Sequence, residues 1–194
     1  MRNLTLLVLL ACNADKPSDD TPVDGDADTD TDSDTDTDTV PDTDCATDQL
    51  AMSPGTGAFA YEPLVAGDRV TVVHGPQGGW HLWVAGSVTG TAATSVLVAP
   101  QVVVLRDGTQ LAGDQEPQAV AVTSDGCGGT FYGGFAYLDD YTPDAGTLLD
   151  AICRLEGEAL ELTVTVTDPA TGDTTTTAVE VVAERDPYDE AFCK

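Results

Sequence analysis

Basic residues are scarce in this sequence, which holds 7 Lys and Arg against 34 Asp and Glu and has a formal net charge of −27. Such a chain repels phosphate backbones, so nucleic acid is not an expected partner. It contains only two histidines and no Gly-x-Ser-x-Gly motif that would present a nucleophile on a sharp turn. Carboxylates are too numerous to single out a catalytic pair. We therefore expect a protein that is not an enzyme.

An apolar run long enough to cross a bilayer is also absent, since the run over residues 4–11 is far too short. It follows Arg2 and ends with Ala11 before Cys12, the pattern of a secretory signal peptide. With a cysteine at the cleavage point, the segment resembles the lipobox of bacterial lipoproteins. That resemblance implies that residues 1–11 are a signal peptide and that Cys12 carries the lipid, palmitate included. The membrane is then a partner through the lipid anchor.

Asn13 follows the cysteine. An Asp at this position would resemble the inner-membrane retention signal of some bacteria, and this chain lacks it. We therefore expect the bacterial cell envelope, and the outer membrane in particular. The sequence fits a domain on the periplasmic face of the outer membrane and one on the cell surface equally well.

Residues 12–44 are predicted to form a disordered spacer. From residue 13 onward they hold 13 Asp against Lys16, a net charge of −12, and Asp alternates with Thr or Ser from Asp28 to Thr39. So little apolar surface cannot offset the entropy lost on folding, and like charges extend the chain. The segment would average roughly 30 Å if neutral and reach roughly 110 Å at most. The alternative is a calcium loop over residues 24–30, which lacks the EF-hand glycine and glutamate spacing.

Residues 45–194 have the composition of a single domain and contain four cysteines, Cys45, Cys127, Cys153 and Cys193. An even count in an exported chain predicts two disulfides. Of the three possible pairings we favour Cys45–Cys193, which closes the domain ends, with Cys127–Cys153. The chain lacks Cys-x-x-Cys pairs, which disfavours a zinc or iron-sulfur centre.

Alternating apolar and polar residues predict strands, most clearly over residues 160–167, followed by a turn at 168–173. Pairing Thr167 with Thr174 places Leu162 opposite Val179 and Leu160 opposite Val181, with the large apolar groups on one face. Further strands are expected over residues 68–74, 80–88, 95–99 and 101–105, and a short helix within 145–155. This pattern favours an all-β fold, an immunoglobulin-like β-sandwich with two disulfides. A jelly roll or small barrel is the alternative.

Both histidines and both tryptophans fall within residues 73–84. If 75–80 form a hairpin loop, His74 and His81 pair across it and could begin a copper site. An immunoglobulin sandwich would instead separate the two histidines, with Trp80 in the core and His81 and Trp83 facing outward. Together with residues 63–68, this stretch resembles a domain that follows Thr-Asp spacers in lipoproteins of myxobacteria-like bacteria. The resemblance implies a lipoprotein context and no activity.

Aromatic residues and glycines are concentrated in residues 126–150, ahead of several aspartates. Rings beside carboxylates suit sugars or a calcium-organised glycan site. The binding candidates are Phe131, Tyr132, Tyr137 and Tyr141, and the metal candidates are Asp139, Asp140 and Asp144. The competing interpretation is packing, since Phe135 and Tyr137 alternate as core residues of a strand would.

Together these observations predict a membrane-anchored, noncatalytic envelope or cell-surface lipoprotein that displays a β-sandwich interaction domain. We expect no obligatory cofactor, and the partner would be an envelope protein or a glycan. The alternative is a surface module that binds a metal, calcium or copper, or a glycan.

Overall fold

The computed structural model describes residues 45, 49–76, 78–138, 147–191 and 193. The chain divides into two units, residues 1–39 and 40–194, and every described residue belongs to the second. The predicted signal peptide, the Cys12 lipid site and the spacer lie outside the described residues. So do the candidate residues Asp139, Asp140, Tyr141 and Asp144.

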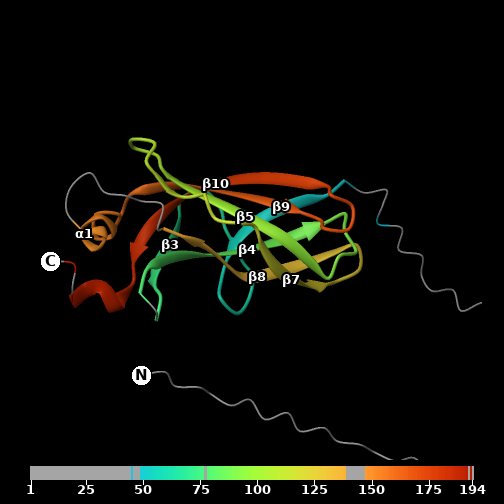
Figure 1. The fold of residues 1–194 in the computed structure, drawn as a ribbon, viewed down its shortest axis with the longest axis horizontal. Helices are drawn as coiled ribbons and strands as arrows, with labels where there is room; N and C mark the ends of the chain where they lie inside the picture. Colours follow the sequence, from blue (N-terminus) through green and yellow to red (C-terminus); the bar gives the residue numbers. More distant parts are fainter. Residues whose placement is uncertain (1–44, 46–48, 77, 139–146, 192, 194) are drawn as a thin grey trace, which may run out of the picture. The chain divides into compact units, whose positions relative to one another are not determined.

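The domain is all-β, with ten strands and little helix among its described residues (Figure 1). The strands are β1 Ala51–Thr56, β2 Glu62–Pro63, β3 Asp68–His74, β4 Trp80–Thr89, β5 Ser95–Val104, β6 Gln110–Ala112, β7 Gln118–Ser124, β8 Gly128–Tyr137, β9 Ala159–Thr167 and β10 Thr174–Arg185. The helical elements are α1 Leu148–Cys153 and the 3-10 helix η2 Pro187–Ala191.

The strands form two facing layers, which confirms the predicted β-sandwich. By their hydrogen-bonded pairings, one layer contains β2, β1, β4 and β8, and the other contains β10, β9, β5 and β6. Strand β3 pairs in parallel with β10 through its first residues and with β4 through its last two. Strand β7 likewise pairs with β5 and then with β8. Because β4 also pairs with β8, the hydrogen-bonded ladder closes on itself, as in the barrel that was the alternative.

The β9–β10 hairpin has the predicted register, with Thr167 opposite Thr174, Leu162 opposite Val179 and Leu160 opposite Val181. Its turn begins at buried Asp168, which accepts hydrogen bonds from the hydroxyl of Thr91 (2.5 Å) and from the amide of Ala170 (2.7 Å). The alternating pattern predicted the core face correctly, because the following apolar residues are buried: Leu160, Leu162, Val164, Val166, Val179 and Val181.

The two strands expected over residues 95–99 and 101–105 are a single strand, β5, that runs through Pro100. One edge of β5 pairs with β9, and Pro100 lies opposite Val164 there. The other edge pairs with β7 as far as Val98 and with β6 from Val102 onward. Pro100 therefore falls in the gap between two partners, where its missing N–H breaks no ladder.

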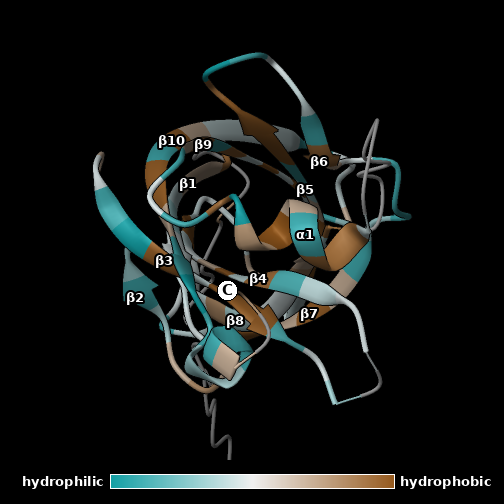
Figure 2. Cartoon of the chain, turned by 90° about the vertical axis from the view of Figure 1, so that its left-hand side faces the viewer, coloured by the Kyte–Doolittle hydropathy of each residue, from teal (hydrophilic) through white to brown (hydrophobic). Residues whose placement is uncertain are grey.

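The predicted short helix is α1, which begins at a capping box between Thr147 and Asp150. It lies over one end of the sandwich (Figure 2), and its Ala151 and Ile152 are buried there. Among the described residues no helix has the length and apolar character needed to cross a bilayer.

Two disulfides are present, as predicted, but the expected pairing is wrong. Cys45 is bonded to Cys127 and Cys153 to Cys193, with Cα–Cα distances of 5.2 and 5.3 Å, in place of Cys45–Cys193 and Cys127–Cys153. The reason is the direction of the strands. The start of β1 lies beside the end of β4, which is also where β8 starts, so a cysteine ahead of β1 meets the one ahead of β8. The chain after β10 is at the opposite end, next to α1 (Figure 1). We call these the Cys45 end and the α1 end.

Candidate functional site

At the α1 end, a buried carboxylate joins the start of β4 to the C-terminal 3-10 helix. Asp189 on η2 is only 1% exposed. Its Oδ2 accepts a hydrogen bond from Trp80 Nε1 and its Oδ1 lies against His74 Nδ1, each at 2.6 Å. The ring centroids of His74 and Trp80 are 4.7 Å apart, and the ring of Tyr188 meets that of His74 edge-on, with a centroid distance of 5.4 Å. Asp186 accepts a hydrogen bond from the backbone N–H of His74.

This arrangement explains why Asp189 can be buried. An isolated buried carboxylate is strongly unfavourable, whereas two ring N–H donors supply the partners that it loses in water. The three side chains therefore fasten η2 to the sandwich, and the Cys153–Cys193 disulfide fastens the same segment covalently. The sequence signalled nothing special about Asp189, because acidic residues are so abundant in this chain.

The two histidines do not form a pair. The β3–β4 hairpin sets His74 opposite Trp80 and Val73 opposite His81. Because neighbouring residues of a strand point to opposite faces, His74 and His81 lie on different faces of the hairpin. Within the described part of the chain, no three or more His, Cys, Asp or Glu side chains are placed to hold a metal ion. The imidazole pair expected as the start of a copper site is therefore not assembled.

His81 and Trp83 face away from the core, as predicted, and Trp80 packs against the core. His81 is nevertheless only 8% exposed, and its Nε2 has no hydrogen-bond partner among the described residues. This burial lowers the pKa of His81, and the negative charge of Asp186 opposes the change only in part. His81 is therefore neutral at pH 7.

Four rings from β4 and β8 gather on the outer side of their layer, and we call them the aromatic face: His81, Trp83, Phe135 and Tyr137. His81 lies opposite Tyr137 and Trp83 opposite Phe135 in the strand register. The ring centroids of His81 and Trp83 are 4.7 Å apart, and those of Phe135 and Tyr137 are 4.5 Å apart. The side-chain amide of Gln118 exchanges two hydrogen bonds with the backbone of Phe135 and so holds this part of β8 in place.

Phe135 and Tyr137 point outward, so the interpretation that they pack as core residues of a strand is wrong. The pairing of β4 with β8 shifts register between Val84 and Gly86, at a bulge that includes Gly133 in a left-handed conformation (φ 76°). One extra residue reverses the side-chain alternation beyond it. Phe131, before the bulge, therefore points inward while Phe135 and Tyr137 point outward.

The binding candidates separate accordingly. Phe131 is fully buried in the core and cannot touch a ligand, so that candidate is wrong. Tyr132 and Tyr137 are 40% and 42% exposed on β8. Trp83 and Phe135 were not among the candidates, yet they lie half-buried beside Tyr137 on the aromatic face.

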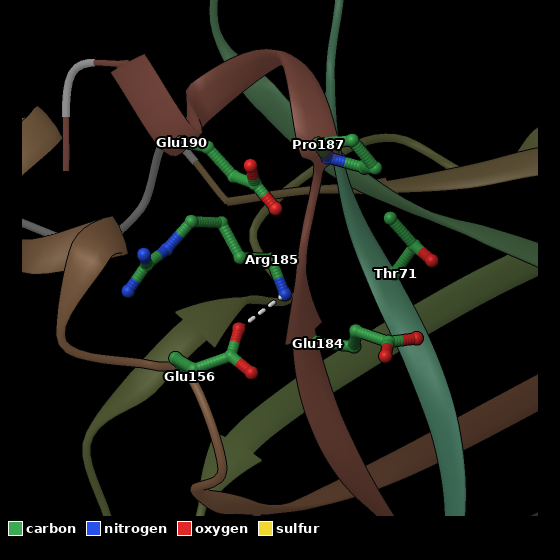
Figure 3. A pocket seen from close by; sticks show the side chains of 6 residues that line it. All are labelled: Thr71, Glu156, Glu184, Arg185, Pro187 and Glu190. Carbon is green, nitrogen blue, oxygen red and sulfur yellow. Dashed lines mark hydrogen bonds between the residues drawn. The ribbon is translucent and has the colours of Figure 1, made fainter.

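A shallow pocket of about 400 Å³ lies near the α1 end, where Thr71 of β3 and the end of β10 approach Glu156, Pro187 and Glu190 (Figure 3). The carboxylate of Glu156 accepts a hydrogen bond from the backbone N–H of Arg185 at 2.6 Å. With Glu184 the lining includes three carboxylates beside the Arg185 guanidinium, a balance that favours cations over anions.

No family model matches the chain, and no curated protein matches it either. Among solved structures, the CooA pilin subunit from enterotoxigenic Escherichia coli shares 14% identity over 70% of this chain and 99% of its own, with a TM-score of 0.34. The N-terminal domain of PorA shares 12% identity over 70% of this chain and 98% of its own, with a TM-score of 0.27. These TM-scores are too low to support an inference about fold or function.

Proposed function

We propose that this chain is a bacterial lipoprotein of the cell envelope, anchored through Cys12, whose β-sandwich acts by binding a partner and not by catalysis. In this proposal residues 1–11 are the signal peptide, the Asp-rich spacer extends from the anchor, and the domain is presented from the outer membrane.

The observation that carries the proposal is the use of the cysteines. The chain has five, and four of them form the two disulfides of the domain. Disulfides of this kind persist in oxidising compartments outside the cytoplasm, which agrees with export. Cys12 is the remaining cysteine, and it stands directly after the apolar run of the predicted signal. Acylation of its thiol accounts for its position in the sequence.

Within the domain, the connection to the spacer and the C-terminal elements lie at opposite ends. The spacer leads to Cys45, at one end of the sandwich, while α1, η2 and the start of β4 lie at the other. Strand β4 has 10 residues, so the two ends are separated by roughly 30 Å. The start of β4, where the aromatic face begins at His81, therefore lies at the α1 end of the domain.

Metabolic labelling with an alkyne fatty acid tests the anchor. The wild-type chain should take up the label and sediment with membranes, whereas Cys12→Ser should lose both properties while keeping its two disulfides. Label on the Cys12→Ser chain, or an unlabelled wild type, would refute lipidation.

Membrane fractionation on a density gradient tests the sorting. The wild-type chain should co-fractionate with the outer membrane, and Asn13→Asp should shift toward the inner membrane if the retention signal operates in the host. A wild-type chain found in the inner membrane would contradict the outer-membrane assignment and leave lipidation untouched.

A further inference from the structure

The aromatic face is an uncharged area on a strongly acidic domain. Neither β4 nor β8 contains an Asp, Glu, Lys or Arg residue. The sequence from Cys45 onward carries 21 acidic and 5 basic residues, a net charge of −16. Tyr137 is 42% exposed, and the neighbouring residues Trp83 and Phe135 are half-buried. A group of aromatic side chains at the surface of an uncharged area, on a domain otherwise rich in carboxylates, is typical of a contact surface.

The charge distribution limits what this surface can contact. An anionic polymer would find no Lys or Arg on these strands to bind. The surrounding carboxylates would also repel it. Asp186 acts on buried His81 at one edge of the face, but β4 and β8 hold no carboxylate that could pair with a cationic ligand on the face itself. The complementary occupant is therefore neutral.

The size of the face distinguishes a small occupant from a protein. Two strands about 4.8 Å apart, with two rows of side chains about 6.7 Å apart, give a footprint on the order of 150 Å². A stable protein interface needs about 800 Å² on each partner. The face instead matches about one or two sugar rings laid flat across the strands.

We infer that the aromatic face binds a neutral glycan, whose sugar rings stack on Trp83, Phe135 and Tyr137, while buried His81 packs behind these rings. The inference rests on the proposed function, because it names the class of partner that the displayed domain binds. Sugar C–H groups carry partial positive charge and pack on the negative face of aromatic rings, while their hydroxyl groups remain in water. The bulge at Gly133 is what turns Phe135 and Tyr137 outward to form this surface.

A glycan array with neutral and anionic members, probed with the purified full-length chain, is the first test. Cellohexaose and chitohexaose then serve as soluble neutral probes, and hexagalacturonate serves as the anionic one, in calorimetric titrations. Tyr137→Ala removes the most exposed ring of the face and should weaken binding of the neutral probe about tenfold, the effect of one aromatic contact. Tyr188→Ala removes an exposed tyrosine on η2 and is the matched control, with unchanged binding expected.

Tryptophan fluorescence supplies a second measurement that reports position. The chain has two tryptophans, and in Trp80→Phe the remaining one, Trp83, lies within the face. Saturable quenching of Trp83 by the neutral probe supports the inference, even if Tyr137→Ala proves unstable.

Three results would overturn the inference. They are no binding to any neutral glycan below roughly 1 mM, binding that Tyr137→Ala leaves unchanged, and a dimer seen by sedimentation that Tyr137→Ala dissociates. The last would make a second copy of the chain the occupant. Fatty-acid labelling of the same preparation keeps the two proposals separate, because lipidation and glycan binding can fail independently.

Discussion

Replacing Asp189 by alanine should strongly destabilise the domain. Asp189 accepts hydrogen bonds from Trp80 Nε1 and from His74 Nδ1, both at 2.6 Å, and it is 1% exposed. The substitution leaves two ring N–H groups without their acceptor in a partly buried position. Each hydrogen bond to a charged group contributes about 1.5–3 kcal/mol.

The expected loss is about 3–5 kcal/mol in the free energy of unfolding, since the two hydrogen bonds share one carboxylate and do not add fully. This is a large part of the 5–15 kcal/mol typical of a domain. Asp189→Asn should lose less, because the amide oxygen still accepts one of the two hydrogen bonds. Glu190→Gln changes the adjacent carboxylate, which is exposed, and should alter stability by no more than about 0.5 kcal/mol.

Urea unfolding followed by circular dichroism, with both disulfides intact, measures these differences. A double-mutant cycle with Trp80→Phe isolates the hydrogen bond between the carboxylate and the indole, and should return a coupling of about 1–3 kcal/mol. If Asp189→Ala and Glu190→Gln have the same midpoint, or if the coupling is zero, the carboxylate does not fasten η2 as argued.

Three further predictions concern covalent links, packing and pH. Non-reducing peptide mapping should recover the Cys45–Cys127 link, which closes a loop of 82 residues and contributes about 4.5 kcal/mol; recovery of Cys45–Cys193 contradicts the fold. Gly86→Ala should lower the free energy of unfolding by about 1–3 kcal/mol, measured in urea, because the added Cβ would lie 2.6 Å from the buried ring of Phe131. Since burial lowers the pKa of His81 from 6.5, the unfolded chain takes up a proton first as the pH falls, so stability decreases below about pH 6.5. Measured by thermal unfolding between pH 7 and 5, His81→Phe should reduce this decrease, and an identical pH profile would refute the assignment.

Much of the fold could be predicted from the sequence because β-strands encode their buried face locally. The alternation in residues 160–167 and the turn at 168–173 were enough to predict the β9–β10 register, from the pair Leu160–Val181 to the pair Thr167–Thr174. The outward direction of His81 and Trp83 followed from the same period of two residues. The even number of cysteines in the domain predicted two disulfides.

The candidate site was less predictable, because its residues come together through contacts between distant segments. His74 and Asp189 are 115 positions apart, and nothing local distinguishes Asp189 from the other acidic residues. The aromatic face depended on one bulge in β8. Phe131 and Phe135 are four positions apart and would point to the same face of a regular strand, but the bulge between them turns Phe135 to the outer face. A bulge depends on how two strands pair, so the sequence of either strand alone does not predict it.

By itself, the sequence determined the charged spacer, the lipobox-like start, the strand pattern and the buried faces of most strands, because these depend on composition and on neighbours a few residues away. The tertiary structure alone decided which cysteines meet, which carboxylate is buried beneath His74 and Trp80, and which aromatic rings face outward. Those outcomes depend on strand direction and register across the whole closed ladder, and every strand contributes to that geometry.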